Sequence, residues 1–142
     1  MIVAIDFDGT VVTHEFPKVG RDIGAVPILK KLVERGDKLI LFTMRSDRVN
    51  GGETGDPTIE DITGNFLTDA INWFKENDIP LWGIQANPTQ KNWTTSPKCY
   101  AELYIDDAAL GCPCIRDIEI SERPFVNWFV IEQYLEQAGI LF

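Results

Sequence analysis

Two aspartates separated by one residue, near the start of the chain, form the part of the sequence best suited to chemistry. The segment reads Asp6-Phe7-Asp8-Gly9-Thr10 and directly follows a short apolar run. Residues two apart on a strand point to the same side, so Asp6 and Asp8 can converge on one site. Adjacent carboxylates repel each other unless a cation or a shared proton relieves them. An oxygen-rich site of this kind suits Mg²⁺, which proteins usually hold through one or two carboxylates.

The same segment also has a purely structural interpretation. Gly9 allows a sharp turn and Thr10 can tie that turn by hydrogen bonding, and Asp-Gly pairs often form turns or helix caps after a strand. Taken alone, the segment leaves both interpretations open, because short motifs frequently occur by chance. The evidence for a site comes from the ends of the other predicted strands.

Polar residues follow two further apolar runs at the point where each run ends. Thr43 comes directly after the second run, and Asp106 and Asp107 come directly after the fourth, with Lys98 eight residues before Asp106. The carboxyl ends of parallel strands meet at one edge of a sheet, where open α/β folds place their ligand sites. The sequence therefore predicts that these residues and the first aspartate pair gather at that edge.

Short apolar runs and helical periods supply the elements that must position these residues. Four runs are apolar on both faces, as strands of a buried parallel sheet are: Ile2–Ile5, Leu39–Phe42, Leu81–Ile84 and Leu103–Ile105. Helical spacing predicts a helix over Val26–Val33 that stops at Gly36, one from Ile59 to Trp73 that begins with a Thr58/Asp61 capping box, and one from Phe125 to Ala138. This order predicts an α/β fold, Rossmann-like and three-layered, with a mainly parallel sheet and right-handed crossovers.

Length and composition narrow the classes of protein that fit. A chain of 142 residues with 44% apolar residues fits one globular domain, residues 1–142. The formal net charge of −9 disfavours binding to nucleic acid and to anionic membranes. The opening apolar run lacks the basic flank of a signal peptide, and no stretch approaches the roughly 18 apolar residues that span a bilayer. We therefore expect a cytoplasmic protein without a membrane partner.

With its motifs in this order, the sequence resembles the haloacid dehalogenase (HAD) superfamily of phosphohydrolases, which use an aspartate nucleophile. The resemblance rests on DFDGT, LILFT, a lysine and YIDD, spread over nearly the whole chain. It implies that Asp6 is the nucleophile and Asp8 the general acid/base, and that Thr43 and Lys98 hold the phosphoryl group. Because Asp8 must donate a proton to the leaving oxygen, its proton affinity should rise relative to that of Asp6.

The resemblance also implies the metal and its ligands. Mg²⁺ would be bound by Asp6, Asp106 and the backbone carbonyl of Asp8. Asp107 is a further candidate, through a water or by orienting its neighbours, and a strand-end cap is its alternative role. Lys91 is the alternative to Lys98 as the phosphate-binding lysine, although its polar surroundings favour a mobile, solvated side chain.

The connections after the first motif and after Thr43 are too short for the large cap domain that some HAD proteins carry. Only about 14 residues separate Thr10 from the first predicted helix, so we expect a capless member with an open site. An open site suits a large substrate, or one that a neighbouring subunit of a homo-oligomer encloses. Arg45, Lys91 and Trp93 are candidates for contact with the leaving group, with surface charge and packing as their alternative roles.

These expectations combine into one function and one alternative. The first is an Mg²⁺-dependent phosphohydrolase that acts on phosphate monoesters, small or macromolecular, through an aspartyl-phosphate intermediate. The alternative is a non-catalytic protein on the same fold that binds phosphate or a partner. A phosphorylation-receiver domain is rejected because it needs its phosphorylated aspartate at the end of a middle strand, and the sequence has Thr43 or the Gln85-Ala86-Asn87 region there.

Overall fold

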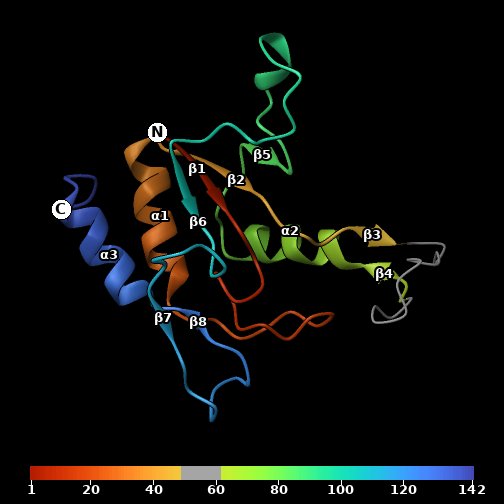
Figure 1. Ribbon diagram of the computed structural model, residues 1–142, viewed down its shortest axis with the longest axis vertical. Coiled ribbons are helices and arrows are strands. Elements are labelled where there is room, and N and C mark those ends of the chain that lie inside the picture. Colours follow the sequence, from red (N-terminus) through yellow and green to blue (C-terminus); the bar gives the residue numbers. More distant parts are fainter. Residues whose placement is uncertain (49–61) are drawn as a thin grey trace.

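The centre of the molecule is a four-stranded parallel sheet in the order β5-β2-β1-β6 (Figure 1). The computed structural model describes residues 1–48 and 62–142. The strands are β1 (Ile2–Ile5), β2 (Lys38–Leu41), β5 (Gly83–Ile84) and β6 (Leu103–Ile105), and every pairing between them is parallel. The prediction of an α/β fold with a parallel sheet is therefore confirmed.

Three helices cover one face of this sheet: α1 (Ala25–Arg35), α2 (Phe66–Glu76) and α3 (Trp128–Gln137). One buried cluster joins residues of all three helices to the odd-numbered residues of the strands, which are Val3, Ile5, Leu39, Leu41 and Ile105. The even-numbered Ala4 and Ile40 are buried but lie outside that cluster. Because alternate residues of a strand point to opposite faces, the helices pack on the odd-numbered face.

The irregular segment 85–102, which connects β5 to β6, packs on part of the opposite face, where Ala4 and Ile40 are buried while Ile84 and Tyr104 remain partly exposed. A Cβ added to Gly83 would lie 3.2 Å from Ile40 Cγ1 and 3.1 Å from Pro88 Cδ, so this segment packs closely on the even-numbered face. The Tyr104 hydroxyl also donates a hydrogen bond to the Cys99 carbonyl. Right-handed crossovers produce this arrangement, because the chain moves from β1 to β5 over one face and returns to β6 over the other. The sheet is thus the middle of three layers.

The second helix begins later than the sequence predicts. Gly64 and Asn65 form the short strand β4, which pairs antiparallel with β3 (Asp47–Arg48), and α2 starts only at Phe66. The predicted capping box, Thr58 with Asp61, and Ile59 lie outside the described residues. Among the described residues, Ile62 precedes the helix instead of belonging to it.

The third helix also begins later, at Trp128 instead of Phe125. Phe125 and Val126 form β8, which pairs antiparallel with β7 (Cys114–Ile115). Asn127 then caps the helix, because its side chain accepts a hydrogen bond from the backbone N–H of Val130. The smaller differences are a second strand shifted by one residue, a third strand shortened to its last two residues, and a 3₁₀ turn, η1 (Gln90–Asn92).

The connections that could hold a cap domain contain little regular structure. Residues 6–24, between β1 and α1, form a loop with isolated bridges only, and the described part of the connection after β2 contains only the two-residue strands β3 and β4. Over residues 1–48 and 62–142, no helix is both long enough and apolar enough to cross a membrane.

Candidate functional site

The carboxyl ends of β1 and β6 bring three aspartates together. Ile5 pairs with Ile105 in the sheet, so the residues that follow, Asp6 and Asp106, leave the two strands side by side. The Asp6 N–H donates to the Ile105 carbonyl at 3.0 Å, which extends the strand pairing to the edge of the site. Carboxylate oxygens of Asp6, Asp106 and Asp107 all lie within 4.8 Å of one another. This is a donor set that a hard divalent cation accepts.

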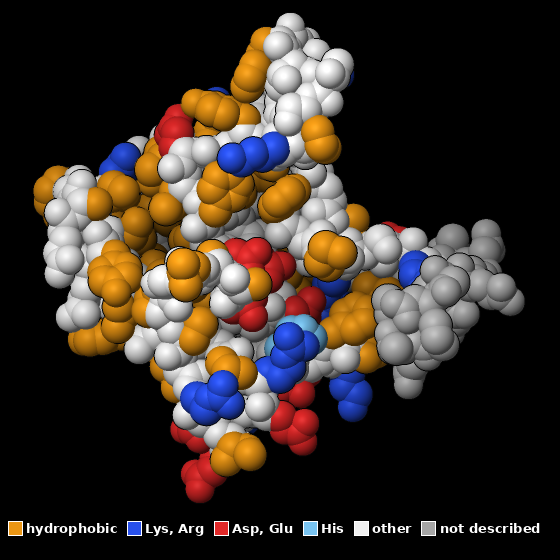
Figure 2. Space-filling view, viewed as in Figure 1, with side chains coloured by type: hydrophobic (Ala, Val, Ile, Leu, Met, Phe, Trp, Pro, Cys, Tyr) orange, Lys and Arg blue, Asp and Glu red, His pale blue; other side chains and the backbone are white. Residues whose placement is uncertain are grey.

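These aspartates form part of the wall of a cavity of about 580 Å³ at the same edge of the sheet. Five residues predicted for the phosphoryl and metal site line it, namely Asp6, Asp8, Thr43, Asp106 and Asp107, and Arg45 lines it as well. The lining also includes residues for which the sequence predicted no such role: His14, Phe16, Phe42, Met44, Ala108 and Arg123. Figure 2 shows the acidic side chains gathered in a hollow near the middle of this face.

The Asp6 carboxyl has an unusual affinity for protons. Burial, together with the neighbouring carboxylates of Asp106 and Asp107, raises its pKa to about 7, although the backbone hydrogen bond from Phe7 opposes the rise. The repulsion between the carboxylates thus acts on Asp6, and the higher proton affinity that the sequence led us to expect at Asp8 stays a prediction. A cation between the three carboxylates would remove this repulsion, so the donor set fits a bound divalent metal.

The raised pKa of Asp6 predicts how the stability of the metal-free protein depends on pH. The folded protein binds a proton at Asp6 more tightly than the unfolded chain does, so this group lowers the free energy of unfolding as the pH rises from about 4 to about 7. We expect thermal melts in EDTA to show a fall in Tm over this range that Asp6→Asn removes. Mg²⁺ should raise the Tm of the natural protein more at pH 8 than at pH 5. An equal pH dependence in both proteins would contradict the assignment.

Asp107 is held at the site by the turn that follows β1. The buried Thr10 hydroxyl lies 3.2 Å from Asp107 Oδ1 and accepts a hydrogen bond from the Asp107 N–H at 3.1 Å. The Thr10 carbonyl in turn accepts a 2.7 Å hydrogen bond from the indole of Trp128 in α3. Thr10, itself held by Trp128, therefore contacts both the side chain and the backbone of Asp107, which fits a residue that holds or orients a metal.

Gly9 is the position where this turn tolerates no side chain. Its φ of +79° lies in the left-handed region, and an added Cβ would lie 2.6 Å from Asp107 Oδ2. Gly9→Ala should therefore displace Asp107 and weaken Mg²⁺ binding by about tenfold in a calorimetric titration. Gly139→Ala is the matched control, because Gly139 has a similar φ of +73° with nothing within 4 Å of the added Cβ. If both variants bind Mg²⁺ equally well, the close approach at Gly9 has no role in the site.

Arg45 is buried and donates two hydrogen bonds to the Asp8 carboxylate. Arg45 Nε donates to Asp8 Oδ2 and Nη2 donates to Asp8 Oδ1, each at 2.7 Å. The Arg45 side chain is 1% exposed and that of Asp8 is 11% exposed. The sequence offered Arg45 as a leaving-group contact; in the structure it positions Asp8 instead.

Backbone carbonyls and two aromatic rings complete the surroundings of Arg45. Its nitrogens also donate to the carbonyls of Phe66 at 3.1 Å and Lys18 at 2.8 Å. The guanidinium lies 5.0 Å from the ring centroid of Phe7 and 5.1 Å from that of Phe16. Arg45 thus ties the loop after β2 to the loop after β1 and to the start of α2.

Thr43 is fixed by a residue that the sequence analysis missed. The Gln85 side chain accepts a hydrogen bond from the Thr43 N–H at 2.9 Å and donates to the carbonyls of Thr43 at 2.8 Å and Arg45 at 2.9 Å. The Thr43 hydroxyl accepts a hydrogen bond from the Arg45 N–H at 3.1 Å. Gln85 directly follows the third predicted strand, and that position was the signal that could have identified it.

The two lysines considered for phosphate binding lie elsewhere. Lys98 is exposed and does not line the cavity of about 580 Å³, and its carbonyl accepts a hydrogen bond from the Gln90 side chain. Four residues later, the Glu102 N–H bonds to the carbonyl of Ile2, at the amino end of β1. Lys98 therefore approaches the amino edge of the sheet, whereas the aspartates lie at the carboxyl edge. In a parallel sheet, a residue that shortly precedes a strand lies toward the amino edge, away from the aspartates.

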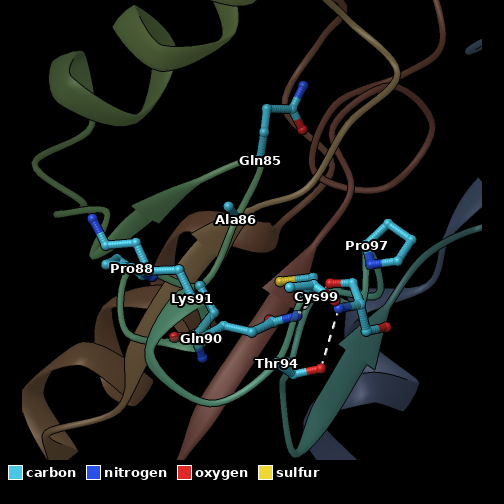
Figure 3. Close-up of a pocket in the computed structure, with 11 residues that line it drawn as sticks. Gln85, Ala86, Pro88, Gln90, Lys91, Thr94, Pro97 and Cys99 are labelled. Atoms are coloured by element: carbon cyan, nitrogen blue, oxygen red, sulfur yellow. Dashed lines mark hydrogen bonds between the residues drawn. The ribbon is translucent and has the colours of Figure 1, made fainter.

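Lys91 and Trp93 belong to the segment that packs on the even-numbered face. Lys91 lines a separate cavity of about 500 Å³ (Figure 3), together with Gln85, Asn87 and Cys99 among others. Trp93 is 61% exposed and packs edge-on against Tyr100, with 5.5 Å between the ring centroids. Neither residue lines the cavity that holds the aspartates.

Comparison with known proteins gives a structural neighbour and no function. No family model matches the chain, and no curated protein matches it either. The solved structure of a conserved protein coded by a locus of Bacteroides thetaiotaomicron is similar, with a TM-score of 0.69 and 26% sequence identity. The similarity covers 97% of this chain and 91% of that one, so the α/β fold is shared over nearly the full length of both.

Proposed function

We propose that the protein is a Mg²⁺-dependent phosphohydrolase that cleaves phosphate monoesters through an aspartyl-phosphate on Asp6. The observation that carries the proposal is the convergence of the Asp6, Asp106 and Asp107 oxygens within 4.8 Å, in a cavity that Asp8 and Thr43 also line. Cytoplasmic localisation and a phosphorylated substrate, small or macromolecular, belong to the same proposal. The resemblance to HAD phosphohydrolases supports it, since these residues occupy the motif positions.

Each residue has a role that its surroundings allow. Asp6, at the end of β1, is the nucleophile: attack of its oxygen on phosphorus breaks the bond to the leaving oxygen and forms an acyl phosphate, which water then hydrolyses to free phosphate. Asp6, Asp106 and Asp107 would hold the Mg²⁺, with the Asp8 carbonyl, and the metal would supply positive charge that screens carboxylate and phosphoryl oxygens from each other. Thr43, held by Gln85, would donate its hydroxyl to the phosphoryl group.

Asp8 is the residue that would exchange protons. Its two oxygens accept charge-assisted hydrogen bonds from Arg45, which hold the carboxylate in one orientation. A carboxylate held in this way can accept a proton from the attacking water. To protonate the leaving oxygen, Asp8 must first carry a proton, so one bond to Arg45 has to lengthen at that step.

The same contact favours the second candidate function. If Arg45 keeps both oxygens of Asp8 occupied throughout, the site binds phosphate without turning it over. The protein would then be a non-catalytic phosphate- or partner-binding protein on the same fold.

A phosphatase screen separates the two functions. The purified chain is assayed over a broad panel of phosphate esters in Mg²⁺ and in EDTA, with Asp8→Asn in parallel. Turnover that EDTA abolishes, and that Asp8→Asn slows far more than it weakens binding of vanadate, supports the phosphohydrolase. Mg²⁺-dependent binding of vanadate without turnover of any ester supports the binding protein.

A further inference from the structure

The rim of the cavity carries a pair of polar side chains that the proposed reaction does not use. Arg123 Nη1 lies 2.9 Å from His14 Nε2, and both residues line the cavity that contains Asp6 and Asp8. They are 109 residues apart in the chain, so the fold alone brings them together. Figure 2 shows histidine and basic side chains directly beside the acidic hollow.

The backbone on both sides of this pair is fixed. The buried Ser121 hydroxyl donates to Glu15 Oε1 at 3.0 Å, which ties the loop that carries Arg123 to the loop that carries His14. Three residues after Arg123, the Val126 N–H donates to the Gly9 carbonyl at 3.0 Å, within the turn that holds Asp107. These bonds restrain the backbone on both sides of the Arg123 and His14 side chains, which lowers the conformational entropy lost when a ligand binds there.

The charges around the cavity give Arg123 a specific use. Four carboxylates line the cavity, and Arg45 is already paired with one of them. Among the described residues of the lining, Arg123 is the cation whose partner is a ring nitrogen instead of a carboxylate. A chain with a net charge of −9 repels anionic substrates, and the exposed guanidinium of Arg123 in the cavity lining offsets that repulsion.

The other residues that line the cavity favour a ligand with an apolar organic part between the aspartates and the Arg123/His14 pair. Phe16, Phe42 and Met44 line the cavity and are 41%, 37% and 97% exposed. Exposed apolar side chains beside a charged pair suit a ligand that has both an apolar part and a charged part.

We propose that Arg123 and His14 bind an anionic group on the leaving-group side of the substrate. The substrate class is then a phosphate monoester whose organic body carries a second anion, either a carboxylate or a second phosphate. The fork of a guanidinium pairs with both of these groups in a bidentate manner. The inference rests on the proposed function, which places the transferred phosphoryl group at Asp6.

Phosphonates test this inference without turnover, because a carbon–phosphorus bond does not undergo the proposed hydrolysis. Binding of methylphosphonate, phosphonoacetate, 3-phosphonopropionate and methylenediphosphonate is measured by calorimetry in Mg²⁺. We expect at least one of the three ligands with a second anion to bind about tenfold more tightly than methylphosphonate. Comparison of the carboxylate and diphosphonate ligands identifies which anion is preferred.

Variants at the rim then assign the preference to Arg123. Arg123→Gln should abolish the preference and leave the affinity for methylphosphonate unchanged. Arg116→Gln is the control, because Arg116 is exposed on the same excursion between β7 and β8 and does not line the cavity. It should bind every ligand as the natural protein does.

Two results would overturn the inference. One is a natural protein that shows no preference for any ligand with a second anion. The other is an Arg123→Gln variant that loses affinity for methylphosphonate as strongly as for the longer ligands, because Arg123 would then contact the transferred group itself. Failure of the proposed function has a different signature, since a protein that turns over no ester can still show the binding preference and its loss.

Discussion

We expect Asp6→Asn to lower the Mg²⁺-dependent phosphatase activity by roughly three orders of magnitude or more without changing the native fold. The amide is a poor nucleophile, and it removes one of the three carboxylates that converge within 4.8 Å. In the metal-free protein the same change relieves repulsion in the cluster, so the fold should become more stable. Initial rates on the best ester of the panel, together with thermal melts in EDTA, measure both effects.

Two further measurements make this prediction specific. Asp69→Asn, an exposed aspartate on α2, is the control and should keep full activity. Rapid quenching with a radiolabelled ester should trap phosphate on the natural protein and none on Asp6→Asn. Full activity in Asp6→Asn, or turnover that ignores EDTA, would exclude an aspartyl-phosphate mechanism.

Arg45→Ala is expected to destabilise the protein by about 3–5 kcal/mol, because it leaves the Asp8 carboxylate without its buried partner. The same change removes donors to the Phe66 and Lys18 carbonyls. Urea denaturation of the natural protein, Arg45→Ala, Asp8→Asn and the double variant gives the coupling between the two side chains. The double variant should be clearly less destabilised than the sum of the two single changes, since the pair is in direct contact.

The effect of Arg45 on catalysis is tested with a milder substitution. Arg45→Lys keeps a positive charge but cannot form the two-pronged contact with Asp8. It should lower kcat while the KM for the best ester stays close to that of the natural protein, because Asp8 is misplaced and the phosphoryl contacts remain. Arg21→Ala, at an exposed arginine outside the cavity lining, should change neither stability nor kcat. An Arg45→Lys variant with normal kcat would limit Arg45 to a structural role.

The sheet and the acidic cluster could be predicted because their signals are local. Runs that are apolar on both faces located the strands to within two residues, and the residues that follow Ile5 and Ile105 had to emerge side by side. Because the strands pair in parallel, the residues that directly follow them in the sequence lie next to each other at one edge of the sheet. The later start of α2 could not be predicted, because the pairing of Gly64 with Arg48 overrides helical periodicity there.

The contacts of Arg45 and Lys98 depended on information that no local pattern carries. An arginine four residues after a strand is typical of an exposed loop, and its burial requires Phe7, Phe16 and three separate backbone carbonyls. For Lys98, the eight residues that separate it from Asp106 do not define a position, because the direction from which the chain enters β6 decides which edge of the sheet the lysine meets. Arg123 and His14 illustrate the same limit, since 109 residues separate them.

The irregular layer over the even-numbered face has a consequence for which part of the molecule unfolds locally first. Two buried amide side chains hold much of it together: Asn87 bonds to the Tyr100 carbonyl, and Gln90 bonds to the carbonyls of Ser96 and Lys98 and to the Tyr100 N–H. Because this layer has no long helix or strand, we expect it to open at a lower free energy than the sheet and its amides to exchange with solvent sooner. Gln85 lies at the start of this segment, so we expect its opening to loosen the hydrogen bonds that hold Thr43, while Asp6 stays bonded to the Ile105 carbonyl at the edge of the sheet.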